Sequence, residues 1–83
     1  MTPKISKAEI IEGYRVILYY SNGEIKEIDF SKYLSEPFYS KFNDYEYFKK
    51  FKILVDTLIW DDDVDISPEE LYEFSVSAKL KRD

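Results

Sequence analysis

Apolar and aromatic residues form two runs in the first third of the chain, separated by a polar turn. Residues 14–20 combine β-branched, aromatic and aliphatic side chains, which is typical of a strand buried on at least one face. Residues 24–30 form a second strand-like run with Ile25, Ile28 and Phe30 as its apolar positions, and the intervening Asn22-Gly23 is a strong hairpin signal. Residues 5–11 predict a further short strand or an extended lead-in, followed by a turn at Glu12-Gly13.

The register of this hairpin depends on the length of its loop. A two-residue loop at Asn22-Gly23 would place Val16 beside Asp29, whereas a three-residue loop with Gly23 as a left-handed bulge places Val16 beside Ile28. We favour the second register because strands pair so that one face is continuously apolar. That face would consist of Tyr14, Val16, Leu18, Ile28 and Phe30.

The middle of the chain predicts short helical elements. A helical turn is expected near residues 31–34, and Pro37 interrupts any longer element. Asn43 as N-cap with Glu46 three residues later predicts a short helix over residues 44–51. Its aromatic residues recur at helical spacing and should face the sheet: Tyr45, Phe48 and Phe51.

The last third contains two short apolar runs and one clear helix start. Residues 52–55 and 57–60 flank Asp56 and predict either a tight hairpin or one long bent strand, and both remain open. Ser67 as N-cap with Pro68 at the first helical position predicts a helix to about residue 76. We expect its inward side chains to be Leu71, Phe74 and Ser75.

These elements predict one α+β domain over residues 1–76. The expected architecture has two layers, with a mostly antiparallel sheet in the order β-β-β-α-β-β-α and helices packed on one face. A length of 83 residues leaves no room for a second core, and 45% hydrophobic residues suffice for one. Residues 77–83 are polar and basic, and we expect a frayed tail there.

Composition excludes much of enzyme chemistry. The sequence contains no cysteine and no histidine, which removes thiolate nucleophiles, the usual zinc ligands and the best proton-transfer side chain near neutral pH. We therefore predict no enzyme activity, no catalytic residue, no metal and no cofactor. A secretory signal and an apolar stretch long enough to span a bilayer are both missing, so we expect a cytoplasmic protein without a membrane partner.

Negative charge is concentrated in residues 53–78. This segment has no lysine or arginine and eight acids: Asp56, Asp61, Asp62, Asp63, Asp65, Glu69, Glu70 and Glu73. A calcium loop starting at Asp61 would need glycine at the position of Ile66 and glutamate at the position of Tyr72, so the spacing does not fit. We favour a solvated acidic turn that flanks the positive N-terminus of the next helix.

The aromatic surplus predicts a protein-binding surface, because tyrosine and tryptophan are enriched at interfaces. The rings that we expect to be least buried are Tyr19, Tyr20, Tyr39 and Tyr47, and Asp61, Asp62 and Asp63 would steer a basic partner protein. An unpaired sheet edge is an alternative docking surface, and self-association stays open. Nucleic-acid-linked regulation, through Lys49, Lys50 and Lys52 or through acidic mimicry of a phosphate backbone, is the alternative function.

The run from Tyr14 to Glu24, followed by Asp29, Phe48, Trp60, Asp65 and the segment from Pro68 to Tyr72, resembles the small bacterial domain of unknown function 2442 family. The resemblance covers about residues 4–76. It implies a two-layer α+β fold and no activity. It also implies a free-standing domain, often encoded beside a small partner in a toxin–antitoxin-like pair, or one fused ahead of a DNA-binding module for which this chain has no room. Asp61-Asp62-Asp63 stands where the family often has a Pro-Asn-Gly-like turn.

Overall fold

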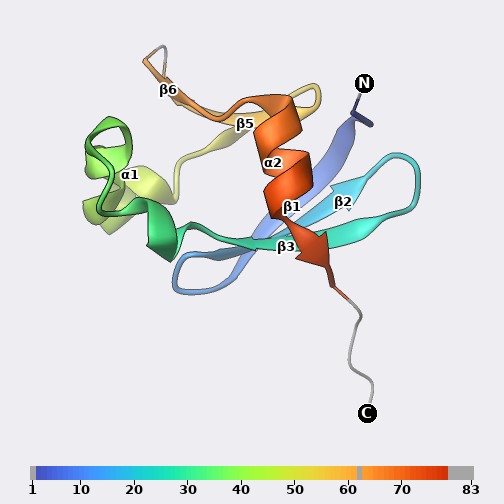
Figure 1. The fold of residues 1–83 in the computed structure, drawn as a ribbon, viewed down its shortest axis with the longest axis horizontal. Helices are drawn as coiled ribbons and strands as arrows, with labels where there is room; N and C mark the ends of the chain where they lie inside the picture. The colour runs from blue at the N-terminus through green and yellow to red at the C-terminus, as the bar shows by residue number, and fades with distance from the viewer. Residues whose placement is uncertain (1, 62, 79–83) are drawn as a thin grey trace.

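The structure is a computed structural model that describes residues 2–61 and 63–78. Strands are its most frequent element, and short helices connect several of them (Figure 1). The strands are β1 (Ile5–Glu12), β2 (Arg15–Tyr20), β3 (Ile25–Asp29), β4 (Lys52–Leu54), β5 (Thr57–Asp61), β6 (Val64–Asp65) and β7 (Val76–Ser77). The α-helices are α1 (Tyr45–Phe48) and α2 (Pro68–Phe74), and 3₁₀ helices span Phe30–Tyr33 and Pro37–Asn43.

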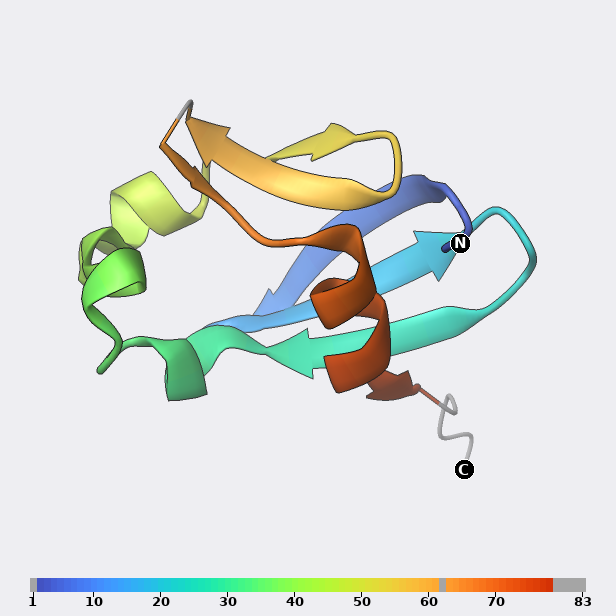
Figure 2. The same ribbon diagram turned by 45° about the horizontal axis from the view of Figure 1, so that its top comes forward.

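The described strands divide into two antiparallel sheets. One sheet has the order β1-β2-β3-β7 and the other the order β4-β5-β6. The three-stranded sheet and α2 lie over one face of the four-stranded sheet (Figure 2). The predicted α+β class with mostly antiparallel strands is confirmed, and the division into two sheets is a feature that the sequence did not predict.

The β2–β3 hairpin has the predicted three-residue loop. Val16 pairs with Ile28, and the Phe30 amide donates to the Tyr14 carbonyl at 3.0 Å. Gly23 adopts φ +95°, a conformation that glycine reaches without steric cost. The register was predicted from a continuous apolar face. That face does point into the core, since Val16, Leu18, Ile28 and Phe30 are all buried.

Aromatic rings fill the space between the two sheets. Phe48 of α1 is fully buried, with its ring 4.6 Å from that of Tyr14 and 5.3 Å from that of Phe42. Trp60 of β5 is also buried, and its indole N–H donates to the Phe48 carbonyl at 2.8 Å. Tyr45 and Phe51 pack against the same core, so the predicted inward face of this helix is confirmed.

The cap and length predicted for α1 are wrong. Asp44, not Asn43, caps the helix, because its carboxylate accepts a hydrogen bond from the Glu46 amide at 3.2 Å. Asn43 instead ends the preceding 3₁₀ helix, where its amide group donates to the carbonyls of Leu34 and Ser40. The helix therefore begins one residue later than expected, and it ends at Phe48.

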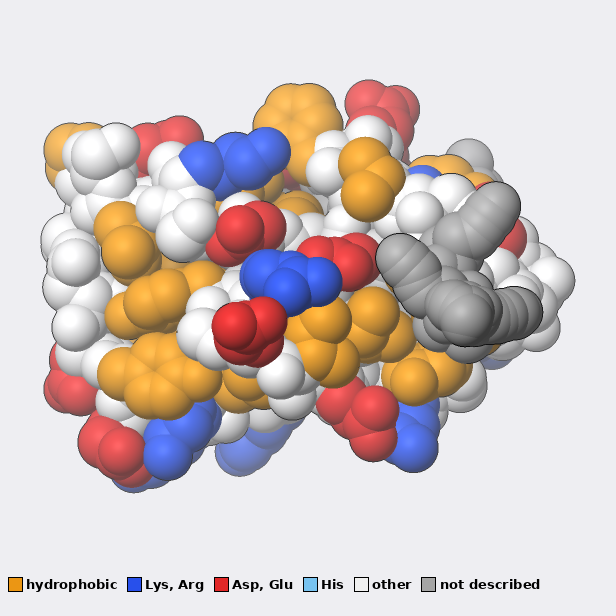
Figure 3. All heavy atoms as spheres, turned by 90° about the horizontal axis from the view of Figure 1, so that it is seen from below, with side chains coloured by type: hydrophobic (Ala, Val, Ile, Leu, Met, Phe, Trp, Pro, Cys, Tyr) orange, Lys and Arg blue, Asp and Glu red, His pale blue; other side chains and the backbone are white. Residues whose placement is uncertain are grey.

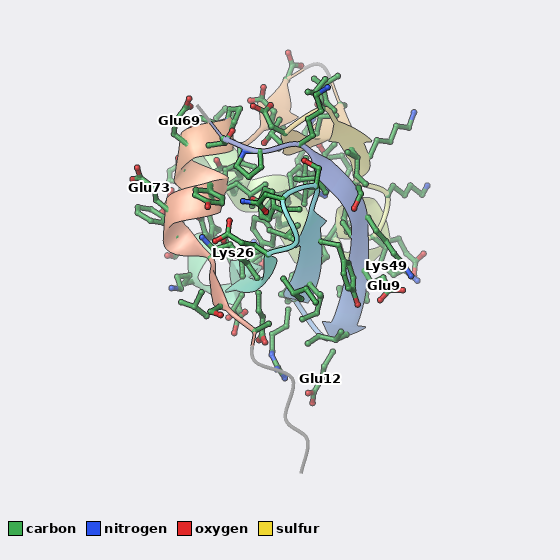
Figure 4. The ribbon with its side chains drawn as sticks, turned by 90° about the vertical axis from the view of Figure 1, so that its right-hand side faces the viewer. Glu9, Glu12, Lys26, Lys49, Glu69 and Glu73 are labelled. Carbon is green, nitrogen blue, oxygen red and sulfur yellow. The ribbon has the colours of Figure 1, made fainter. Side chains whose placement is uncertain are left out.

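At the other end of the chain, Ser67 caps α2 as predicted, but two expectations are wrong. The helix ends at Phe74, whose side chain is 58% exposed, while Leu71 and Ser75 are buried. Ser77 belongs to β7 and pairs with Lys26, so the fold continues past the residue where fraying was expected. Lys26 also reaches beneath α2, and its ammonium group donates to the Tyr72 carbonyl at 2.6 Å (Figure 4). The rest of the predicted tail, residues 79–83, lies outside the described residues.

Among the described residues, other elements of the fold cover only one face of the four-stranded sheet (Figure 2). Its outer face carries apolar side chains separated by acidic and basic ones (Figure 3). Arg15 forms ion pairs there with Glu12 at 2.9 Å and Glu27 at 2.6 Å. Across residues 2–61 and 63–78, no helix has the length and hydrophobicity required to cross a membrane.

Candidate protein-docking site

An open pocket of about 600 Å³ lies between the β4–β5 turn and the start of α2. We call it the turn pocket. The turn lies beside the first turn of α2 in both ribbon views (Figures 1 and 2). The pocket is lined by Leu54, Val55, Asp56, Thr57, Asp65, Ile66, Ser67 and Pro68.

Val55 has an unusual backbone conformation at this pocket. Residues 52–60 form the hairpin that was one of the two predicted alternatives, and Val55 and Asp56 make its turn. Val55 adopts φ +56°, the one positive φ among the described residues other than glycine. A β-branched residue in this region is a genuine outlier and costs on the order of 1–3 kcal/mol. Its side chain is nevertheless 58% exposed, so little burial compensates for the strain.

The N-terminal segment holds this turn in place. The Ile5 amide at the start of β1 donates to the Val55 carbonyl at 2.8 Å. The Thr2 hydroxyl donates to the Asp56 carboxylate at 2.8 Å. These two contacts connect the turn to the edge of the four-stranded sheet, so the strained conformation is fixed by tertiary structure.

The floor of the pocket is buried and hydrogen-bonded, and its rim is apolar. Thr57 and Ile66 are buried, and the Thr57 hydroxyl donates to the Ile66 carbonyl. On the rim, Leu54 is 51% exposed next to Val55. Contiguous exposed apolar side chains at the mouth of a pocket are typical of a binding site.

The charge at the turn pocket is negative. Asp56 is half-buried and Asp65 is exposed, and none of the described lining residues is a lysine or an arginine. Glu69 and Glu73 extend this acidity along the outward side of α2 (Figure 4). The site therefore combines an apolar anchor point with carboxylates, which suits a segment that carries both apolar and basic side chains.

Replacing Val55 with glycine should raise the free energy of unfolding by about 1 kcal/mol, because it removes the φ strain and glycine's larger unfolded-state entropy offsets only part of that gain. Urea unfolding measures the change. Val76 is a matched control, since it is 64% exposed but lies in β7. Val76→Gly should lower the free energy of unfolding by about 0.5–1 kcal/mol. If both variants are destabilised equally, Val55 is not strained.

The exposure predicted for two of the four interface tyrosines is wrong. Tyr20 and Tyr39 are buried in the core, whereas Tyr19 and Tyr47 are half-buried. Tyr19 and Tyr20 point to opposite faces of β2, because neighbouring residues of a strand alternate. The structure therefore does not bring the four rings together on one surface, and their role in partner binding stays a prediction.

Asp61 of the predicted acidic set is engaged in local structure. One of its oxygens accepts from the Tyr47 hydroxyl at 2.8 Å, and the other accepts from the Asp63 amide at 2.8 Å. The hydrogen bond from Tyr47 is the main reason why the pKa of Asp61 is lowered. The pKa of Tyr47 is raised, mainly because the ring is desolvated by burial and secondly because of this hydrogen bond. The Lys41 ammonium group lies 3.5 Å from the Asp61 carboxylate. Asp63 is exposed, and Asp62 lies outside the described residues.

Acidic residues do not converge on a cation site in the described part of the chain. Residues 2–61 and 63–78 contain no group of three side chains that could hold a metal ion. Asp61 holds the turn through its hydrogen bonds to backbone amides, which is the ordinary structural use of such a residue.

Sequence reasoning missed Leu54 and Val55 as site residues because an apolar run is normally a sign of burial. A signal was nevertheless present. The segment Ile53-Leu54-Val55-Asp56-Thr57 makes a tight turn without glycine or asparagine, the residues that usually supply positive φ. A tight turn without these residues forces another residue, here Val55, into positive φ, and this strain lowers stability.

A family model described as "Protein of unknown function (DUF2442)" matches residues 5–77. The chain belongs to this family. The match runs from the first residue of β1 to the last residue of β7, so both sheets and the turn pocket are features of the matched domain. The resemblance predicted from the hairpin, the tryptophan and the α2 start is thereby confirmed. No curated protein and no solved structure matches the chain.

Proposed function

We propose that this chain is a non-catalytic protein-interaction module that binds a partner protein at the turn pocket. The observation that carries the proposal is Val55, an exposed valine held at positive φ on the rim of the pocket. Backbone strain of this kind persists where the surrounding structure fixes it, and it clusters at binding sites. The absence of cysteine and histidine from the sequence supports the non-catalytic part of the proposal.

The partner binds through a segment that carries an apolar side chain next to basic ones. The apolar side chain packs on Leu54 and Val55, and the basic side chains lie beside Asp56 and Asp65. Acidic charge around the pocket raises the association rate with such a partner by steering. Steering by Asp61, Asp62 and Asp63 remains part of this proposal, and Asp63 is the exposed member that the structure describes.

Affinity capture from the native host with matched surface variants tests the proposal. The wild-type chain and Val76→Lys should retain the same partner, and Val55→Lys should lose it. Both variants replace a valine that is more than half exposed with lysine, so the added charge and the loss of exposed apolar surface are matched. Equal capture by the two variants would contradict the proposal. If the captured protein is the product of the adjacent gene, the module has the antitoxin-like role that the family resemblance implies.

Kinetics with the purified partner test the role of charge. Asp56→Asn combined with Asp65→Asn should slow association about tenfold at low salt and have little effect at high salt, because salt screens steering. The measurement is stopped-flow or surface plasmon resonance at two ionic strengths. Unchanged association at low salt would exclude steering by these two carboxylates.

A further inference from the structure

The last residues of the chain have the chemistry that the turn pocket selects. Residues 79–82 are Lys79-Leu80-Lys81-Arg82, one apolar side chain flanked by three basic ones. The pocket offers Leu54 and Val55 as an apolar rim with Asp56 and Asp65 beside it. Charge complementarity of this kind determines which segments dock and in which orientation.

Chain length argues against Leu80 occupying the pocket of its own copy. The described chain ends at Ala78, whose amide donates to the Ile25 carbonyl at 2.9 Å on the edge of the four-stranded sheet. The pocket lies at the opposite end of α2, which is about 10 Å long from its seven residues. The strand β7 continues from α2 in the direction away from the pocket (Figure 1). Leu80 lies two residues beyond Ala78, and two extended residues span only about 7 Å.

We propose that the turn pocket of one copy binds residues 79–82 of a second copy. Leu80 of one chain packs on Leu54 and Val55 of the other, and its flanking basic side chains lie beside Asp56 and Asp65. The contact is reciprocal in a two-fold dimer or propagates into short open chains, depending on the relative orientation of pocket and tail. This inference rests on the proposed function because it uses the same pocket, and it makes self-association a competitor of the partner protein.

Sedimentation equilibrium of the full chain tests the self-association. The full chain should associate with a dissociation constant on the order of 0.1–1 mM at low salt, as expected for a short segment in an open pocket. A chain that ends at Ala78, and the full chain with Leu80→Ser, should both be monomeric over the same concentration range. The association should weaken at least threefold in high salt. A full chain that stays monomeric at low salt overturns the inference.

A peptide titration locates the contact. A peptide with the sequence of residues 76–83 is added to the isotopically labelled chain that ends at Ala78. The expected result is saturable chemical-shift changes at the amides of residues 54–57 and 65–67, and a Leu80→Ser peptide should produce changes at least fivefold smaller at equal concentration. Shift changes confined to other residues overturn the inference. The proposed function stands in that case if Val55→Lys still abolishes partner capture.

Discussion

Replacing Phe48 with alanine is expected to lower the free energy of unfolding by about 3–5 kcal/mol, the usual cost of deleting a fully buried phenylalanine. The Phe48 side chain has no exposed surface, and its ring packs against Tyr14, Phe30, Phe42 and Trp60. A domain of this length is stabilised by roughly 4–12 kcal/mol in total. The variant should therefore lose about a quarter or more of the stability of the fold, and its melting temperature by circular dichroism should fall markedly.

Phe74 is the matched control for this substitution. It was predicted to face inward from α2, but its side chain is 58% exposed. Phe74→Ala should therefore change the free energy of unfolding by only about 0.5 kcal/mol or less, as surface substitutions do. A loss for Phe74→Ala as large as that for Phe48→Ala would show that Phe74 packs in the core.

Stability should fall steeply in alkaline solution. Burial is the main reason why the pKa of Tyr20 and the pKa of Tyr39 are each raised from 10.0 to about 12. The folded state then keeps protons that the unfolded state releases, so this stability is complete below pH 10 and is lost as the pH rises toward 12. Each tyrosine should cost about 1 kcal/mol by pH 11 and about 3 kcal/mol at full ionisation. Urea unfolding at pH 8 and pH 11 measures the loss.

Tyr20→Phe separates this effect from general alkaline damage. The Tyr20 hydroxyl is buried without a hydrogen bond among the described residues, and the hydroxyl of Ser75, which lies near enough to influence Tyr20, donates to the Tyr72 carbonyl at 3.0 Å. Removing an unpaired buried hydroxyl should raise the free energy of unfolding by about 1 kcal/mol at pH 8. The loss between pH 8 and pH 11 should shrink by a further 1 kcal/mol or so. An unchanged pH dependence in this variant would show that Tyr20 titrates normally.

The binding site and the stability of the chain are connected through the β4–β5 turn. Val55→Gly should stabilise the fold, and the proposed function requires the valine side chain on the rim of the pocket. Under the proposed function, the rim of the pocket keeps a valine that lowers stability because the partner packs on its side chain. The self-association proposed for residues 79–82 uses this same rim, so one variant, Val55→Lys, affects both contacts.

The sequence by itself determined the elements whose signals are local. Asn22-Gly23 between two apolar runs predicted the β2–β3 hairpin, and the requirement for one apolar face predicted the pairing of Val16 with Ile28. Ser67 and Pro68 predicted the start of α2 in the same way. These predictions succeed because caps, turns and strand alternation depend on a few neighbouring residues.

Only the tertiary structure decided which apolar side chains are exposed. Phe48 and Phe74 each lie at helical spacing, and Tyr20 and Leu54 each belong to an apolar strand, yet one member of each pair is buried and the other is exposed. The difference arises from the position of α2 and the three-stranded sheet over the four-stranded sheet, which depends on contacts between residues far apart in the chain. The strain at Val55 has the same origin, because β1 fixes the turn through Ile5, fifty positions earlier in the sequence.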